Sequence, residues 1–239
     1  MRRPDFARTD LSRIDNADLR FIIENFPLPV RDFQEISSLI NNLPNTLESM
    51  LGSDYLFDSV CDRERLLLGV SPFLLFNVLL RRSLRDHSHK GDRKIVNYLA
   101  NLLALFVHSD RMHRVERDDA QGQQYIIDLI KESETVDTDR RFLIFAHIGN
   151  YALFVTGLFP QWIEYRYRYK RRPVDLQYFI DFGRAYFHRA SGHPRARELG
   201  LEDVFLQLST VFDGYRVVLN HMSSKYLSPA PSSLSAQLV

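Results

Sequence analysis

Three features of this sequence predict an all-α fold, a single-domain bundle of about seven to nine helices. Apolar residues recur at helical spacing along most of the chain, beginning with Phe33, Ile36, Leu39, Ile40 and Leu43. Glycine is sparse, with 10 residues in 239, and no run of alternating apolar and polar residues indicates a strand. The chain also has no internal repeat of about 20 to 50 residues, so a stacked-repeat architecture is excluded.

Helix-start signals place the individual elements. Pro44 ends the first stripe, and Ser71–Pro72 opens a strongly apolar helix, because serine caps free backbone amides and proline at the first position has its φ preset. The next four helices open at turn or capping residues, Gly91–Asp92, Asp118–Asp119, Thr138–Asp139 and Pro173–Asp175. The apolar stripe from Leu201 to Met222 is about six turns long and predicts one final helix.

The two ends of the chain differ from its helical body. Residues 1–30 are charged and contain the helix breakers Pro27 and Pro29, which indicates an N-terminal arm. Residues 31–227 form the predicted helical domain. Residues 228–239 carry two prolines and four serines, and we expect a flexible tail there.

Composition excludes several classes of protein. The chain has 31 Lys and Arg against 30 Asp and Glu, and 45% of its residues are apolar. A disordered chain would contain fewer apolar residues, and a general nucleic-acid binder would carry a large positive surplus. Cys61 is the only cysteine, so no intrachain disulfide can form. No apolar signal follows the charged start Met1–Asp5, and we therefore expect a cytoplasmic protein.

The stretch from Phe142 to Gln161 contains no charged residue and has about the 20-residue length that spans a bilayer. A basic run follows it, as the flank of a membrane span would require. However, the stretch also contains His147, Gly149 and Asn150, which suit a buried helix better than a lipid-facing one. We predict a core helix and no transmembrane span.

No pattern of residues predicts a metal, a cofactor or a catalytic residue. Di-iron helical bundles repeat a carboxylate–histidine pair on two helices, whereas Asp110 with His113 is a lone pair. His87 and His89 lie near a helix end, where solvated histidines are common. The chain has no nucleophile elbow and no glycine-rich phosphate loop. These observations lean against an enzyme without excluding one.

His147, Asn150 and Tyr151 are spaced to share one face of the uncharged helix. This cluster is a candidate pocket for a polar ligand or a cofactor. The alternative is a buried histidine whose ring nitrogens bond to neighbouring helices, and we favour that alternative.

The strongest local anomaly is the segment Tyr165–Arg172, which holds three tyrosines and five cations. Cations bind phosphates and aromatic rings stack on bases, so nucleic acid or an anionic membrane surface is a possible partner. A solvated connection between helices, paired with the acidic stretch Glu116–Asp139, is another interpretation. Because the total charge nearly cancels, we favour that connection or a protein partner. The candidate partner-binding residues are Trp162, Tyr165, Arg166, Tyr167, Arg168, Tyr169, Lys170, Arg171 and Arg172.

Several short motifs resemble the signature of an uncharacterised bacterial family of all-helical proteins. They are Gly69–Pro72 with Leu79–Arg82, Ile148–Phe154, Thr156–Pro160, and Val174–Asp175 with Phe182–Tyr186. The family pattern has an acid where this chain has Asn150. The resemblance implies a bacterial cytoplasmic helical protein and brings no activity or cofactor. Independently of it, Gly149, Gly157 and Gly183 would let helices approach closely, since glycine has no side chain.

The leading hypothesis is a non-enzymatic interaction or regulatory protein that binds another protein or itself. Its expected contact surfaces are the Tyr165–Arg172 segment, the final helix and the N-terminal arm. An enzyme or cofactor-binding protein with a pocket near His147 is the alternative. A binder of nucleic acid or of an anionic surface, acting through Tyr165–Arg172, is the second alternative.

Overall fold

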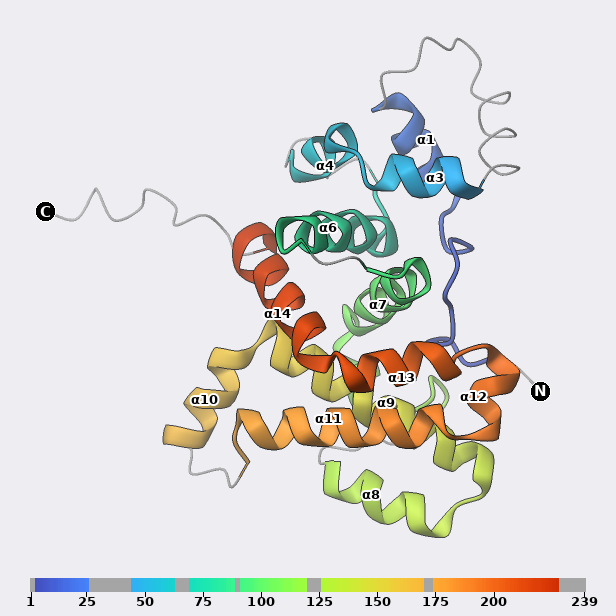
Figure 1. The fold of residues 1–239 in the computed structure, drawn as a ribbon, viewed down its shortest axis with the longest axis vertical. Helices are drawn as coiled ribbons and strands as arrows, with labels where there is room; N and C mark the ends of the chain where they lie inside the picture. The colour runs from blue at the N-terminus through green and yellow to red at the C-terminus, as the bar shows by residue number, and fades with distance from the viewer. Residues whose placement is uncertain are drawn as a thin grey trace, which may run out of the picture.

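The computed structural model is all-α, as predicted (Figure 1). It describes residues 3–25, 44–62, 69–88, 91–119, 126–169 and 174–227. These described residues are 77% helical, form 12 α-helices and contain no strand. The predicted number of seven to nine helices is therefore wrong, because several expected loops are helical and the expected final helix is divided. The predicted stripe at residues 33–43 and the predicted tail lie outside the described residues.

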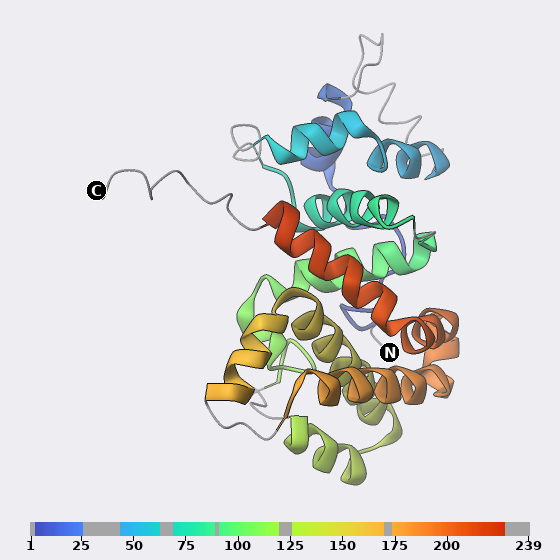
Figure 2. The ribbon, with the colours of Figure 1, turned by 60° about the vertical axis from the view of Figure 1, so that its left-hand side comes forward.

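The helices stack in tiers along the long axis of the molecule (Figures 1 and 2). One end consists of three short helices, α1 (Asn16–Glu24), α3 (Pro44–Leu51) and α4 (Asp54–Cys61). Next comes the pair α6 (Pro72–Asp86) and α7 (Arg93–Phe106). The third tier holds α9 (Thr138–Leu158), α11 (Leu176–Ser191) and α13 (Glu202–Thr210), and α14 (Phe212–Met222) runs from this tier to α6, where η2 (Ser223–Leu227) follows it. The elements at its margins are η1 (Ser109–Met112), α8 (Ile126–Thr135), α10 (Pro160–Tyr169) and α12 (Pro194–Leu199).

The uncharged helix α9 is the centre of the third tier. It is the one described helix long and apolar enough to cross a membrane, and 72% of its 18-residue apolar window is buried by the rest of the fold. A Cβ added at Gly149 would lie 2.7 Å from Cδ1 of Phe187 on α11. A Cβ added at Gly183 on α11 would lie 2.4 Å from Cε2 of Phe212. Glycine at both positions therefore permits the close approach of helices at this centre.

Capping residues explain where the helices begin. Ser71 caps α6 through a hydrogen bond from the Leu74 amide, as predicted, and Asp92 and Asp175 cap α7 and α11. The cap of α9 is Asp137 instead of the predicted Thr138–Asp139, because the Asp137 carboxylate accepts from the Arg140 amide.

The predicted final helix is divided in two. The stripe at 201–222 breaks at Val211, whose φ of −110° and ψ of 30° end α13 before α14 begins. Apolar periodicity continues across this break, since both helices bury their stripes in the same core. Asp118 and Asp119 are not themselves helical, and residues 120–125, where the predicted helix would begin, lie outside the described residues. The two aspartates lie in a turn, where the Asp119 carboxylate accepts from the Glu116 amide, and α8 is described from Ile126.

The described part of the predicted arm, residues 3–25, packs onto the bundle. Phe6 and Ala7 are buried, and the side-chain amide of Asn101 on α7 donates to the carbonyls of Asp5 and Phe6 at 3.0 and 2.9 Å. Farther along, the buried carboxylate of Asp18 accepts from the amide and hydroxyl of Ser71. The start of α6 thus anchors α1. Pro27 and Pro29 lie outside the described residues.

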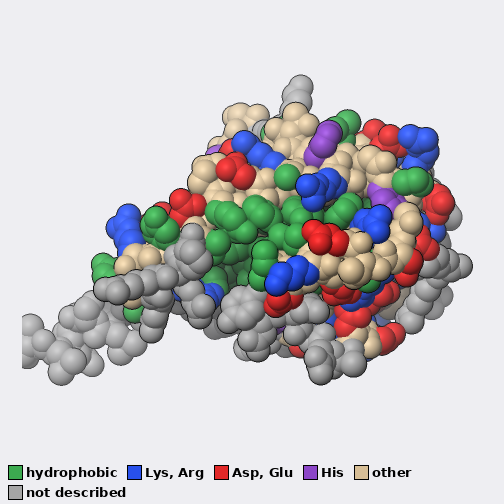
Figure 3. Space-filling model, turned by 90° about the horizontal axis from the view of Figure 1, so that it is seen from below, with side chains coloured by type: hydrophobic (Ala, Val, Ile, Leu, Met, Phe, Trp, Pro, Cys, Tyr) green, Lys and Arg blue, Asp and Glu red, His purple; other side chains and the backbone are tan. Residues whose placement is uncertain are grey.

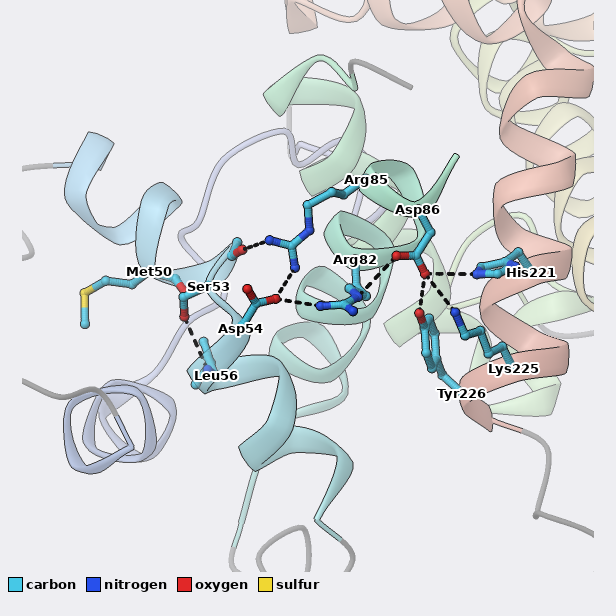
Figure 4. Close-up of polar contacts among 11 residues, drawn as sticks. Met50, Ser53, Asp54, Leu56, Arg82, Arg85, Asp86, His221, Lys225 and Tyr226 are labelled. Atoms are coloured by element: carbon cyan, nitrogen blue, oxygen red, sulfur yellow. Dashed lines mark hydrogen bonds and ion pairs between the residues drawn. The ribbon is translucent and has the colours of Figure 1, made fainter. Parts of the chain in front are cut away.

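A polar cluster around Asp86 joins the end of α6 to the end of the described chain (Figure 4). The Asp86 carboxylate accepts from His221 at 3.1 Å, from Lys225 at 3.2 Å and from the Tyr226 hydroxyl. Arg82 pairs with the same carboxylate at 3.3 Å. Although burial opposes it, the hydrogen bonds from these groups hold the pKa of Asp86 well below its usual range. The cluster therefore fixes η2 against α6.

Candidate functional site

Helix α10 presents an exposed surface of aromatic and cationic side chains. We call its described residues the α10 surface: Trp162, Tyr165, Arg166, Tyr167, Arg168 and Tyr169. The four aromatic side chains are 44%, 51%, 48% and 72% exposed, and Ile163 is the helix residue that is buried. Large aromatic side chains at such exposure are unusual in a monomer's surface unless something binds them.

The segment is helical because Pro160 opens α10 directly after α9 ends. Proline at a first helical position loses no hydrogen bond, and its fixed φ suits the helix. The interpretation of Tyr165–Arg172 as a non-helical connection is therefore wrong for residues 165–169. Lys170, Arg171 and Arg172 lie outside the described residues. By sequence, residues 160–172 carry five cations and one carboxylate, that of Glu164.

The cations of the α10 surface have weak partners within the chain. The Arg166 guanidinium lies over the Trp162 ring, 4.4 Å from its centroid, and Arg168 approaches Glu164 only to 4.0 Å. The acidic stretch is engaged elsewhere, since Arg140 on α9 pairs with three of its carboxylates, those of Glu116, Asp119 and Glu132. The described cations of the segment, Arg166 and Arg168, make no ion pair with Glu116–Asp139, and Lys170, Arg171 and Arg172 lie outside the described residues.

Tyr151 connects the α10 surface to a second group of aromatic rings. Burial raises the pKa of its phenol, and the charge of nearby Arg166 opposes that rise. Its ring contacts Phe179 on α11, with 6.4 Å between centroids. Hydrophobic side chains gather across this end of the molecule, seen from below in Figure 3.

Three rings on α11 form a stack beside this contact. The centroids of Tyr178 and Phe182 are 4.3 Å apart, and those of Phe182 and Tyr186 are 5.7 Å apart. Sequence reasoning did not single out these residues as a surface. Their i, i+4, i+8 spacing is the signal that predicts a ring stack along one helix face.

His147 and Asn150 face different neighbours from Tyr151. The His147 Nε2 lies 3.2 Å from the Met112 carbonyl oxygen, and because a carbonyl can only accept, Nε2 donates and carries the proton. Burial, assisted by the charge of Arg111, lowers the pKa of His147 to about 3. Asn150 accepts a hydrogen bond from the Tyr98 hydroxyl at 2.7 Å. The three candidate residues therefore make separate contacts in the core.

A cavity of about 760 Å³ lies under the N-terminal segment and is lined by none of the candidate residues predicted from the sequence. Residues 3–13 form one wall, and the others come from the start of α6, the end of α7, the 108–118 stretch, α9 and α12. Six arginines line it, Arg3, Arg8, Arg13, Arg111, Arg117 and Arg195. Sequence reasoning missed this site because its residues are scattered over nearly 200 positions and no local motif joins them.

The described residues contain no group of three or more histidine, cysteine or carboxylate side chains that could hold a metal ion. Cys61 is exposed, and the pKa of its thiol is raised by partial burial and by the charge of Asp58. A raised pKa reduces the thiolate fraction and with it the nucleophilicity.

No protein-family model matches the chain, and no curated protein or solved structure is significantly similar to it.

Proposed function

We propose that this chain is a non-enzymatic interaction protein whose α10 surface binds an acidic segment of another protein. The observation that carries the proposal is the exposure of Trp162 and three tyrosines beside arginines on a helix that buries one residue, Ile163. Tryptophan, tyrosine and arginine are the side chains most enriched at the energetic centres of protein interfaces. We further propose a cytoplasmic location and a bacterial origin, which the resemblance implies.

Charge complementarity selects the chemistry of the partner. Residues 160–172 carry five cations and one carboxylate. An acidic partner would gain ion pairs with Arg166 and Arg168 without displacing strong internal ones, since among the described residues Arg168 approaches only Glu164, at 4.0 Å. The exposed aromatic side chains of α10 offer apolar contact area beside this charge, and Tyr178 and Phe182 of α11 are partly exposed. A partner segment with acidic residues and an apolar face fits both features.

Nucleic acid is the less favoured partner. Stacking on bases requires free ring faces, but Arg166 covers one face of Trp162, and Tyr165 contacts Tyr169 with 5.1 Å between centroids. The near-neutral total charge of +1 also gives little long-range attraction to a polyanion.

A photo-crosslinking residue at position 169, the most exposed aromatic position of α10, would capture the partner for identification. The purified partner is then titrated against the wild type and against Trp162→Ala combined with Arg166→Ser and Arg168→Ser. We expect Kd to rise at least about tenfold, as loss of an aromatic anchor with its charges implies.

The matched control is Arg93→Ser with Lys94→Ser, which removes two exposed cations at the start of α7. Its Kd should equal that of the wild type. Equal binding by the α10 variant would contradict the proposal. Capture of single-stranded nucleic acid, or binding to phosphatidylserine vesicles without an acidic protein, would contradict the proposal and support a binder of nucleic acid or of an anionic surface.

A further inference from the structure

The cavity under the N-terminal segment has a fixed wall. Arg111 is buried, and its Nη2 donates to both carboxylate oxygens of Asp5 at 2.8 Å. The buried residues Phe6 and Ala7 and the hydrogen bonds from Asn101 hold the same segment from the other side. The side chains that this segment directs at the cavity are therefore carried on anchored backbone.

Four arginines of the cavity have no carboxylate within ion-pair distance among the described residues. They are Arg3, Arg8, Arg13 and Arg117. Arg3 donates to the Ala7 carbonyl and Arg8 to the Ser12 hydroxyl, both neutral acceptors. Asp10 is influenced by the charges of Arg3 and Arg8, but its carboxylate accepts hydrogen bonds from Ser12.

Arg13 and Arg8 repel each other. Arg13 is half-buried, and burial together with the charge of Arg8 lowers the pKa of its guanidinium, while Asp5 acts in the opposite direction. Asp5 is itself engaged by Arg111. An anion between the two guanidiniums would relieve this repulsion, and arginine binds phosphoryl oxygens through paired N–H donors.

The other residues that line the cavity indicate which further chemical groups a ligand would carry besides phosphate. The side chains of Phe73, Val115 and Phe142 form an apolar floor in the cavity. Among the carboxylates of the lining, Glu116 is paired with Arg140. Asp110, Asp118 and Asp139 have no ion-pair partner in the described part of the chain, and Asp118 directly follows Arg117 in the sequence. Carboxylates accept hydrogen bonds from amino groups.

We propose that this cavity binds a nucleotide, with its phosphates on Arg3, Arg8, Arg13 and Arg117. The ring of the nucleobase would contact the apolar floor of the cavity, and its amino group would donate to the carboxylate of Asp110, Asp118 or Asp139. The volume of about 760 Å³ lies within the range of small-molecule sites and exceeds what a lone phosphate needs. This site is separate from the α10 surface and does not depend on the proposed function.

Isothermal titration calorimetry of the full chain without divalent cations tests the proposal with three probes: ATP, inorganic pyrophosphate and adenosine. ATP should bind most tightly, pyrophosphate more weakly, and adenosine weakest. Arg8→Gln combined with Arg13→Gln should raise Kd for ATP and for pyrophosphate at least about tenfold, because two charge-assisted contacts are lost. Arg8→Gln alone changes one exposed side chain and keeps the test valid if the double variant does not fold.

The matched control is Arg93→Gln with Lys94→Gln, which removes the same charge from an exposed helix start outside the cavity. Its affinity for ATP should be that of the wild type. Absence of ATP binding, or equal weakening by the control pair, would overturn the proposal. Pyrophosphate binding as tight as ATP binding would overturn the assignment of a nucleotide in favour of an inorganic polyphosphate.

Discussion

The Tyr98 hydroxyl on α7 donates a hydrogen bond to the Asn150 carbonyl oxygen on α9, with 2.7 Å between the two oxygens. Tyr98 is completely buried and Asn150 is 2% exposed. Burial raises the pKa of the Tyr98 phenol far above its usual value, so the phenol is protonated and donates. This bond connects the α6–α7 tier to the α9 tier, and it explains a polar residue at position 150 without a ligand.

Tyr98→Phe should therefore destabilise the protein by about 1 to 2 kcal/mol, because the Asn150 carbonyl loses its partner in the core. Urea unfolding followed by circular dichroism measures this free energy. Tyr167→Phe removes a hydroxyl from the exposed face of α10 and should change it by less than about 0.5 kcal/mol. Equal stability of the Tyr98 variant and the wild type would contradict a structural role for the bond.

Acid should destabilise the fold through His147. Its pKa is about 3 in the folded chain and 6.5 ordinarily, so below pH 6.5 the unfolded chain binds a proton that the folded chain does not. The stabilising effect of the neutral ring is complete above pH 6.5 and is lost at about 1.4 kcal/mol per pH unit as the pH falls toward 3. His147→Gln should flatten the fall of unfolding free energy between pH 6.5 and 4. His188→Gln, at an exposed position on α11, should keep the wild-type slope.

Gly183→Ala should destabilise the protein by about 1 to 3 kcal/mol, even though alanine favours a helix by about 1 kcal/mol over glycine. The new Cβ would lie 2.4 Å from Phe212 and 3.0 Å from the Cβ of Ala152. Gly192→Ala is the matched control at the end of the same helix, since its nearest atom would be 3.9 Å away and its φ of −74° suits alanine. Thermal unfolding should separate the two variants, and a Gly183 variant as stable as the control would refute the packing argument.

Asp86→Asn should loosen η2. The substitution removes the ion pairs with Arg82 and Lys225 and weakens the hydrogen bond from His221. A loss of about 1 kcal/mol for this network corresponds to roughly fivefold faster amide exchange at residues 223–227. Hydrogen exchange with mass spectrometry measures it, with Asp181→Asn on the exposed face of α11 as control. Unchanged exchange would show that the ring contact between Phe57 and Tyr226 suffices to hold η2.

The helical class follows from the sequence because each buried helix needs its own apolar stripe, and local signals such as Ser71–Pro72 mark where one begins. The break at Val211 could not be predicted in this way. Both α13 and α14 bury their stripes in one core, so apolar periodicity continues through a change of direction. The same limit applies to Gly183. The sequence shows that this residue is small, but it does not predict that Phe212 is the side chain packed against it.

Of the candidate sites, the α10 surface could be located from sequence, because its aromatic and cationic residues are consecutive. The grouping of His147, Asn150 and Tyr151 assumed that a shared helix face means shared neighbours. In the bundle each residue of that face meets a different element: Met112 of η1, Tyr98 of α7 and Phe179 of α11. The arginine-lined cavity depends on contacts between distant segments, and only the folded chain reveals it.

The contact between Asp5 and Arg111 spans 106 residues of chain, which gives the N-terminal segment a particular history during synthesis. The N-terminal segment is translated before Asn101 and Arg111, the residues that hold it in the fold. On a growing chain, the contact of the Phe6 ring with Phe142 on α9, with 6.3 Å between centroids, can therefore form only after α9 has been translated. The arginine wall can be assembled only after that point, so the cavity is completed by the return of the chain's beginning to a later-made scaffold.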